Sequence, residues 1–593
     1  MSLVIKQPTQ GKLILKNEYF PVPSLDLRFS ESKSLIDVIS NTNLITHTRQ
    51  SGATYVGSDG LIKTAVTNLL LRSEELDQSP WVTTGSATVT QDSSEGLPFP
   101  GATVYRFDFS GGGETVVQSF TYSSTSYAAS IWVKGTAGET IRFSGQSGVA
   151  AENKTLTGSW QRLTLLFTGV AGTATFSINT ASGATARTIW VTAAQLEQSS
   201  TVGEYIKTTS TINSAARFDH DPVTGESLGL LVEEQRTNLI TNSANVAAYF
   251  IEQNSTPTAD AAVSPDGTTT ATLLTPDTTL ATHTSFNTSI SFLADTTYSY
   301  SVFVKPNGYN YLQLLFTSGF GNLPAWVNFN LSGAGFIGFS GGGELSKQIQ
   351  AYPGGWYRCT ITATSGSSTF ASGPAYLVLD SDRNSRDANY AGNNTDGAYI
   401  WGAQLEIGAN GASAPFPTSY IPTAGSTVTR SADVVSISGS NFSSWYKASG
   451  GTVFSQFDSV IPNPGNTFFP WLLWNSGSDY LGSRTATGYE PDRLFFVSRV
   501  SESNSFSSES NPNGYLNMPI GMTKGAFAFE LNNFGVAWNG GTFFSSASGD
   551  IPAGITKLDV GSENGANIIN GHIKRLTYWP QRLPNETLQT ITQ

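Results

Sequence analysis

A repeated phrase is the sequence feature that most constrains how this chain can fold. Residues 398–406 read Ala-Tyr-Ile-Trp-Gly-Ala-Gln-Leu-Glu, and residues 188–197 carry a variant that also ends in Ala-Gln-Leu-Glu. Far upstream, each copy has a matching Thr-Asn-Leu opening, at 67–69 and at 237–239. A recurring start and a recurring finish around a long segment indicate a duplicated domain.

Both copies contain stretches in which apolar and polar residues alternate. Residues 127–134 of the first copy and 298–305 of the second are aligned examples, and glycines and polar turns separate such stretches. Strict alternation is typical of β-strands that are buried on one face, and neither copy has a sustained helical period. The sequence therefore predicts an all-β protein with tandem jelly-roll β-sandwiches.

Five segments follow from the repeats and from the change of pattern after the second copy. We expect a lead segment (1–65), a first jelly-roll sandwich (66–210), a linker strand (211–236), a second jelly-roll sandwich (237–424) and a third β-sandwich (425–593). The lead segment is too small and too polar to bury much core alone, so we expect it to lean on another chain or on the next domain.

Charge and composition exclude several classes of function. The net charge is −12 without a basic cluster, which argues against binding to nucleic acid. The single cysteine, Cys359, excludes disulfides within the chain and cysteine-rich zinc sites. We also expect no membrane insertion and no signal peptide, and hence synthesis in the cytoplasm, because no apolar run is long enough.

The repeated phrases resemble those of one group of proteins. Residues 399–406, 419–423 and 429–433 resemble a phrase repeated in bacteriophage tail-fibre and head-fibre proteins, and residues 217–225 with 229–234 resemble another. The two copies look like carbohydrate-binding jelly rolls. Residues 425–593 are similar to concanavalin-like and laminin-G-like sandwiches.

The resemblance implies a virion fibre or spike protein that recognises host-surface polysaccharide during adsorption. It also implies a homotrimer in which segment 1–65 docks on other virion proteins. Two alternatives stay open. One is a structural decoration or connector protein of the head or tail without glycan binding, and the other is a polysaccharide depolymerase.

Aromatic side chains are the candidates for sugar binding, because a flat ring on an open sheet face can grip a sugar. In strand 127–134, Ile131 and Val133 share one face while Trp132 lies on the other, and Phe303 takes the equivalent position in the second copy. Packing in a core or against another subunit is the alternative for each ring. The predicted sugar-binding residues are Trp132, Phe303, Tyr309, Tyr311, Tyr390, Trp474, Tyr480 and Trp538.

An oxygen-rich stretch in the second copy is the one candidate for a metal site. Its aspartates, Asp380, Asp382, Asp387 and Asp396, could hold calcium, although their spacing does not match the EF-hand pattern. A solvated polar loop is the alternative. We expect no other cofactor.

Catalytic carboxylates are the remaining possibility. Glycoside hydrolysis needs two carboxylates that face each other across a cleft. Pairs occur at Glu490/Asp492, Glu233/Glu234 and Asp219/Asp221, but they lie in expected turns or in the linker. The long β-helix repeats typical of capsule-degrading spikes are also missing. We therefore predict that the protein is not an enzyme and has no catalytic residues.

Overall fold

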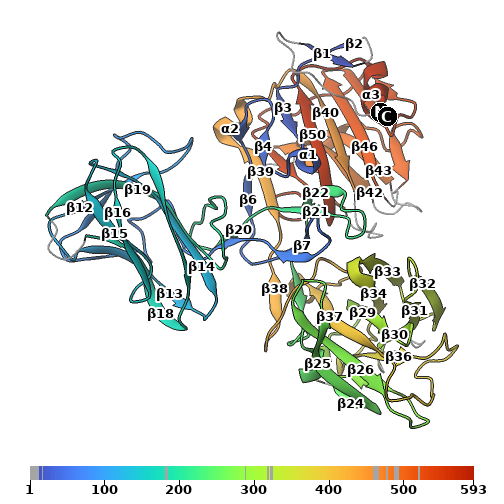
Figure 1. Ribbon diagram of the computed structural model, residues 1–593. Helices are drawn as coiled ribbons and strands as arrows, with labels where there is room; N and C mark the ends of the chain where they lie inside the picture. The colour runs from blue at the N-terminus through green and yellow to red at the C-terminus, as the bar shows by residue number, and fades with distance from the viewer. Residues whose placement is uncertain are drawn as a thin grey trace. The chain divides into compact units, whose positions relative to one another are not determined.

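The computed structural model is almost entirely β-structure (Figure 1), which confirms the predicted fold class. It describes residues 12–15, 18–180, 185–287, 289–316, 319–320, 325–458, 467–475, 479–486, 493–517 and 521–593. The α-helices of these residues are short: α1 (Phe29–Ser32), α2 (Gly439–Ser443) and α3 (Asn585–Ile591). No helix within the described ranges is long and apolar enough to cross a membrane.

The chain divides into two compact units. The smaller unit contains residues 48–52 and 64–215, and the larger unit contains residues 1–47, 53–63 and 216–593. The first jelly-roll copy forms most of the smaller unit. The second copy and the C-terminal sandwich both belong to the larger unit.

Two antiparallel sheets form the sandwich of the smaller unit. One has the order β10 (Val82–Thr84), β13 (Thr115–Tyr122), β18 (Gly172–Asn179), β15 (Thr140–Gln146) and β16 (Ala150–Thr155). The other has the order β11 (Thr88–Gln91), β12 (Tyr105–Phe109), β19 (Arg187–Glu197), β14 (Ser126–Gly135) and β17 (Gln161–Thr168). The apolar residues of the alternating strands meet between the sheets, where Phe143, Phe176 and Ile189 are fully buried.

The second copy repeats this architecture. Its first sheet has the order β25 (Ser255–Val263), β26 (Thr269–Pro276), β37 (Gly397–Gly408), β29 (Thr297–Asn307), β34 (Trp356–Thr364) and β33 (Ser346–Tyr352). Its second sheet has the order β24 (Ile251–Gln253), β27 (Thr284–Phe286), β36 (Pro374–Leu379), β30 (Tyr311–Phe316), β31 (Trp326–Asn330) and β32 (Phe336–Ser340). The repeated phrase forms β37, the central strand that corresponds to β19.

The C-terminal sandwich also has two antiparallel sheets. One has the order β21 (Arg217–His220), β22 (Ser227–Val232), β50 (Gly571–Trp579), β40 (Gly450–Phe457), β46 (Thr523–Glu530), β47 (Asn533–Trp538) and β48 (Phe544–Ser546). The other has the order β44 (Ser503–Ser507), β43 (Arg493–Val500), β42 (Tyr480–Ala486), β41 (Trp471–Trp474), β49 (Lys557–Val560), β39 (Val434–Ser438) and β6 (Thr46–Thr48). Strand β45 (Tyr515–Asn517) pairs with β43 at the side of this second sheet.

The structure changes the expected domain boundaries of the lead segment and the linker. Strand β3 (Leu25–Leu27) pairs with β50, and the linker hairpin β21–β22 pairs with the same strand through β22. Leu25, Leu27 and Leu230 are fully buried in the core of the C-terminal sandwich. Residues 25–48 and 217–232 therefore complete that sandwich and do not form a separate lead segment and linker. Sequence pattern alone could not show this, because the pairing partners lie hundreds of residues apart.

The repeated phrase closes each jelly roll through a buried asparagine. In the second copy, Asn238 Nδ2 donates to the carbonyls of Ala403 and Ile421, and its Oδ1 accepts from the amides of Ile240 and Leu405. The opening Thr-Asn-Leu and the closing Gln-Leu-Glu are thus held side by side, which explains why they recur together.

The first copy has the same closure. Asn68 Nδ2 donates to the carbonyls of Ala194 and Ile206, and its Oδ1 accepts from the amides of Leu70 and Leu196. The phrases shared by the two copies therefore have a structural role, because they form the same closure in each copy.

A β-bulge in the last strand recurs as well. The pairing of β14 with β19 shifts register between Ser130 and Trp132, next to Ala193, whose φ is 56°. The pairing of β29 with β37 shifts at the equivalent place, where Gly402 has a φ of 64°. A left-handed backbone suits glycine and strains alanine, so the first copy carries strain at a position where the second does not.

Candidate functional site

The structure buries several of the predicted sugar-binding rings. The exposed fractions of Phe303, Tyr390, Tyr480 and Trp538 are 1%, 2%, 5% and 4%. A ring that is packed on both faces cannot stack on a sugar. The prediction of open platforms at these positions is therefore corrected.

Each of these four rings has specific packing partners. Phe303 packs edge-to-face against Trp401, with ring centroids 5.4 Å apart, in a cluster that also contains Ile62 of the lead segment. The Trp538 ring stacks on Phe496 at 4.3 Å in the core.

Tyr390 and Tyr480 have partners of their own. The Tyr390 hydroxyl donates to the carbonyl of Val378, whereas the Tyr480 ring contacts Phe469 edge-to-face at 5.8 Å.

The other four predicted rings are partly buried. Trp132 lies edge-on to Phe99, with centroids 6.1 Å apart, and Tyr309 packs edge-to-face against Tyr390 at 6.0 Å. Tyr311 belongs to the same cluster as Tyr309 on the outer face of the β30 sheet. Trp474 donates from Nε1 to Asp559 at 2.8 Å. The structure does not gather these four rings into one site.

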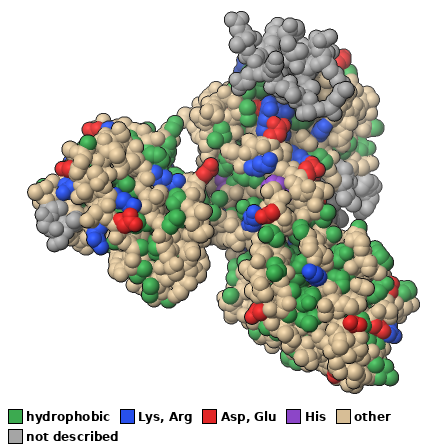
Figure 2. All heavy atoms as spheres, viewed as in Figure 1, with side chains coloured by type: hydrophobic (Ala, Val, Ile, Leu, Met, Phe, Trp, Pro, Cys, Tyr) green, Lys and Arg blue, Asp and Glu red, His purple; other side chains and the backbone are tan. Residues whose placement is uncertain are grey.

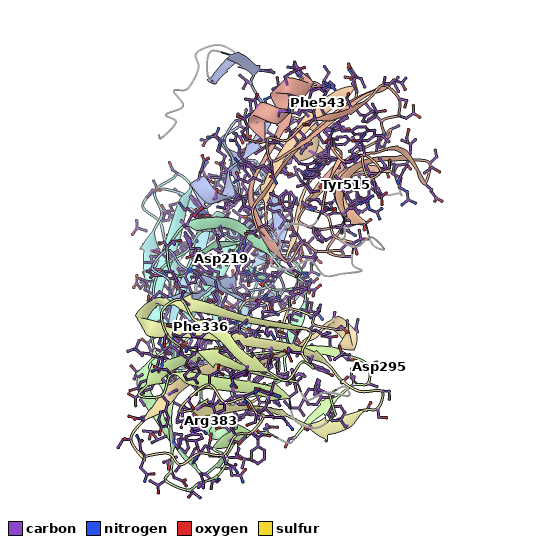
Figure 3. All side chains as sticks on the ribbon, turned by 90° about the vertical axis from the view of Figure 1, so that its right-hand side faces the viewer. Asp219, Asp295, Phe336, Arg383, Tyr515 and Phe543 are labelled. Carbon is purple, nitrogen blue, oxygen red and sulfur yellow. The ribbon has the colours of Figure 1, made fainter. Side chains whose placement is uncertain are left out.

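The four aspartates of the predicted calcium site bind separate partners. Asp380 pairs with Arg383, which Figure 3 labels, at 2.9 Å. Asp382 accepts from Asn328 at 2.9 Å.

The other two aspartates also lie apart. Asp396 accepts from Asn393 at 2.7 Å. Burial raises the pKa of Asp387, whose nearest cation is the neighbouring Arg386. The described residues contain no group of three or more acidic, histidine or cysteine side chains that could hold a metal ion, and these four carboxylates have separate partners.

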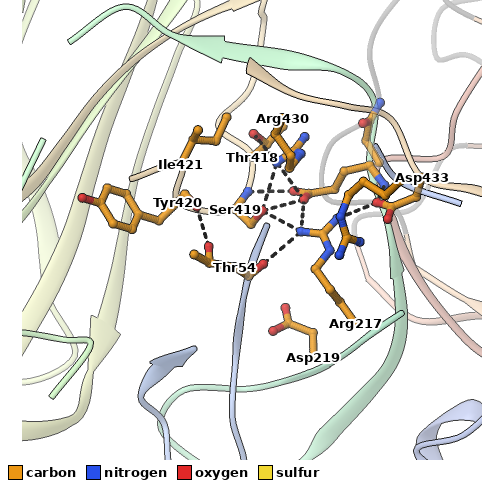
Figure 4. A network of polar contacts seen from close by, with 12 residues as sticks. Thr54, Arg217, Asp219, Thr418, Ser419, Tyr420, Ile421, Arg430 and Asp433 are labelled. Carbon is orange, nitrogen blue, oxygen red and sulfur yellow. Dashed lines mark hydrogen bonds and ion pairs between the residues drawn. The ribbon is translucent and has the colours of Figure 1, made fainter. Parts of the chain in front are cut away.

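Members of two of the carboxylate pairs take part in networks of ion pairs. Glu233 accepts from Arg217 at 2.7 Å and lies 2.9 Å from Arg430, and Arg217 also donates to Asp433 at 2.5 Å (Figure 4). Burial alone would raise the pKa of Glu233, but Arg430 and Arg217 lower it to about 2. Ser419 adds hydrogen bonds from its amide and its hydroxyl to the same carboxylate.

Asp219 of the second pair lies against a histidine. His572 lies with Nε2 3.0 Å from Asp219 and with Nδ1 2.9 Å from Asp458. Burial alone would lower the pKa of His572, but Asp458 and Asp219 raise it to about 10. Both networks join segments of the larger unit, and Asp219, Glu233 and His572 also line a small cavity of about 170 Å³. The Glu490/Asp492 pair lies outside the described residues.

A cavity of about 530 Å³ lies beside the β41–β43 sheet of the C-terminal sandwich. Ligand sites typically measure roughly 300–1000 Å³. The polar or aromatic residues that line the cavity are Glu234, Phe416, Phe468, Phe469, Tyr480, Arg484, Arg499, Glu563, Asn567 and Asn570. Of the predicted sugar-binding residues, only Tyr480 is among them.

Strand geometry places the key side chains of the cavity on one face. Tyr480 and Arg484 are four residues apart on β42, so they point the same way, whereas Leu481 points into the core. Arg499 of β43 lies directly opposite Tyr480 in the register. The same outer face carries Phe495 and, farther along β45, Tyr515 (Figure 3).

The two arginines of the cavity have aromatic and hydroxyl partners. Arg484 Nη1 lies 2.9 Å from the Tyr480 hydroxyl, and its guanidinium lies 5.8 Å from the centre of the Phe495 ring. The Arg499 guanidinium lies 5.9 Å from the centre of the Tyr480 ring, and its buried Nε has no hydrogen-bond partner in the structure. Among the described residues, no carboxylate pairs with Arg484 or Arg499.

The carboxylates of the cavity are held by other residues. Glu234 pairs with Arg236, and Glu563 accepts a hydrogen bond from Asn567 at 2.6 Å. On the face of the molecule in Figure 2, Lys and Arg side chains are scattered, and several lie beside acidic ones. Unlike the arginines of the buried ion network, Arg484 and Arg499 form no ion pair with a carboxylate in the part of the chain that the structure describes.

Sequence reasoning missed Arg484 and Arg499. The alternation in Tyr-Leu-Gly-Ser-Arg at 480–484 could have placed Arg484 beside Tyr480. No local signal brings Arg499 or Asn570 to the same place, because the pairing of β42 with β43 and the path of 563–570 are tertiary.

No family model and no curated protein sequence matches the chain. Solved structures that align with it include the tandem CBM22 modules of Paenibacillus barcinonensis Xyn10C, with 12% identity over 57% of this chain and 98% of that chain, at a TM-score of 0.19. The LG1-3 region of the laminin α2 chain aligns with 10% identity over 80% and 95%, at a TM-score of 0.15.

A chain from the complex of the plant peptide RALF23 with FER and LLG2 aligns with 13% identity over 52% and 91%, at a TM-score of 0.13. TM-scores this low carry no argument, so function is inferred from this chain's own residues.

Proposed function

We propose that this chain is a non-enzymatic bacteriophage fibre protein that binds host-surface polysaccharide through the cavity of its C-terminal sandwich. The observation that carries the proposal is the cavity itself, where Tyr480, Arg484 and Arg499 meet and where neither arginine forms an ion pair with a described carboxylate. Aromatic rings beside polar donors in a concave site are typical of small-ligand recognition. The resemblance of the repeated phrases to those of fibre proteins supports the virion role.

In this proposal the two jelly rolls act as rigid spacers. Their shared phrases form the asparagine closures, and the Phe303 ring lies beneath the lead segment. The residues ahead of β3 attach the protein to other virion proteins. A homotrimer would present three cavities, so that modest affinity per site gives strong adsorption.

The burial of the predicted rings in the jelly rolls favours one alternative. A structural decoration protein would need stable sandwiches and no sugar site, and the buried ion network fits such a role equally well. Removal of the protein would then weaken the particle, and no glycan would bind.

A glycan array probed with the purified full chain tests the binding function. We expect signal on a subset of bacterial oligosaccharides, and Tyr480→Ala should lose it while Tyr311→Ala, on the second jelly roll, keeps it. Absence of signal on every glycan, or equal loss in both variants, refutes the proposed site. Release of reducing ends would instead establish a depolymerase.

Immunogold labelling tests the virion role separately. Antiserum raised against the chain should decorate purified phage particles at the tail or head. Labelling of host cell extracts without labelling of any particle would exclude a fibre.

A further inference from the structure

We infer that the cavity recognises an acidic sugar, in which a carboxylate or phosphate lies between Arg484 and Arg499. This inference rests on the proposed glycan-binding function and names the class of its ligand. Two guanidinium groups lie in one concave site, and within the described ranges neither forms an ion pair, because Glu234 pairs with Arg236 and Glu563 accepts from Asn567. Such a pair of guanidinium groups is complementary to an anion.

The positions of the arginines fix where an anion would lie. Arg499 lies opposite Tyr480 across the β42–β43 pair, and Arg484 contacts the Tyr480 hydroxyl. The Tyr480 side chain therefore contacts both cations and helps to position them. The Nε of Arg499 is buried and has no hydrogen-bond partner among the described residues, so an anion would be held by the terminal nitrogens of the guanidinium group.

The rest of the lining favours a sugar over a simple anion. Glu563 is a carboxylate acceptor whose only described partner is the amide of Asn567. Acetate has no hydroxyl donor for such a group, and the P–OH of inorganic phosphate belongs to the same small anion that the arginines would hold. An acidic sugar has an anionic group for the arginines and separate ring hydroxyls for Glu563. Free inorganic phosphate should accordingly compete poorly.

Each arginine should contribute measurably to affinity. A hydrogen bond to a charged group contributes roughly 1.5–3 kcal/mol, which corresponds to about a 10- to 150-fold change in Kd. We expect Arg484→Gln and Arg499→Gln each to weaken binding at least about tenfold. Arg499→Lys keeps the charge but loses the planar fork, so its loss should be smaller.

Arg142→Gln is the matched control. Arg142 is exposed on β15 of the smaller unit, and it does not line the cavity. Its replacement by Gln removes the same charge as the two cavity variants. It should bind like the wild-type chain. Unchanged thermal midpoints would show that the cavity variants remain folded.

The test uses a glycan array of uronate-bearing, phosphorylated and neutral bacterial oligosaccharides, followed by titration of the best ligand. We expect signal on acidic glycans, loss of binding after carboxyl reduction or dephosphorylation of the ligand, and loss in the two Gln variants. Binding confined to neutral glycans, or unaffected by the Gln variants, overturns the acidic-sugar inference but leaves glycan binding standing. Absence of binding to every glycan refutes the proposed function, and the acidic-sugar inference is then refuted as well.

Discussion

The buried ion network of the larger unit makes one prediction that can be worked out in detail. In this network, Glu233 is the carboxylate that Arg217 and Arg430 share, and both arginines are fully buried. The change Glu233→Gln keeps the shape of the side chain and removes its charge. Arg217 would retain Asp433, but Arg430 would lose its carboxylate partner.

The expected loss of unfolding free energy in Glu233→Gln can be worked out in two ways. Removal of one partner from a buried ion pair costs about 3–5 kcal/mol. The fall of the Glu233 pKa from 4.5 to about 2 corresponds to about 3 kcal/mol, at roughly 1.36 kcal/mol for each tenfold change. We therefore expect Glu233→Gln to destabilise the larger unit by about 3 kcal/mol near neutral pH.

The assay is hydrogen exchange under increasing denaturant, read peptide by peptide. Peptides of the larger unit should lose protection at lower denaturant, whereas those of the smaller unit serve as an internal reference. Glu226→Gln is the control on the same hairpin, because Glu226 is 67% exposed and pairs with Lys574 at the surface. Such a surface pair contributes less than about 1 kcal/mol.

The stabilisation by Glu233 should also depend on pH in a definite direction. Because the folded pKa of Glu233 is lowered, its contribution is present above pH 4.5 and is lost as the pH falls through about 2. The stability difference between wild type and Glu233→Gln should shrink over that window. A Glu233→Gln effect no larger than that of Glu226→Gln would refute the assignment of the network as a stabilising junction.

Three further tests, with five substitutions in all, address other parts of the structure. The pKa of His572 is raised to about 10, so its charge should stabilise the larger unit fully below pH 6.5, and this contribution should be lost as the pH rises through about 10. The difference in unfolding free energy between the wild type and His572→Gln, measured by denaturation from pH 6 to 10.5, should fall over this range. A constant difference would contradict the charged pairing. Ala193→Gly should raise the melting temperature of the smaller unit, because it removes an alanine from a left-handed backbone conformation. Gly402→Ala should lower the melting temperature of the larger unit for the converse reason. Shifts of the melting temperature in the same direction for both variants would argue against the recurring bulge. Asn238→Ala should destabilise only the larger unit and Asn68→Ala only the smaller unit, by about 3 kcal/mol each. Calorimetry measures both effects. A loss of unfolding free energy below about 1 kcal/mol would mean that the asparagine closures are dispensable.

Much of the fold was predictable because its signals are local. Alternation at 127–134 and 298–305 specifies β14 and β29, and the repeated Ala-Gln-Leu-Glu locates the central strands β19 and β37. The all-β prediction is therefore confirmed. The pairing of β3 with β50 was not predictable, because it joins the two ends of the chain without a local pattern.

The site was less predictable for a related reason. Alternation shows that Phe303 lies on the outer face of its strand, but it cannot show that residues 54–64 cover that face. The Trp538 side chain is likewise buried in the core, although the short apolar stretch that carries it gives no local sign of this burial. Tyr480 was identified as a candidate, whereas Arg499 beside it depends on strand register, which the sequence does not encode locally.

The structure of the full chain with the tightest-binding oligosaccharide from the array is the most direct test of the central claim. The account predicts sugar density in the cavity of the C-terminal sandwich, with its anionic group within hydrogen-bond distance of Arg484 and Arg499. Sugar bound on the sheet faces of either jelly roll, with this cavity empty, would contradict it.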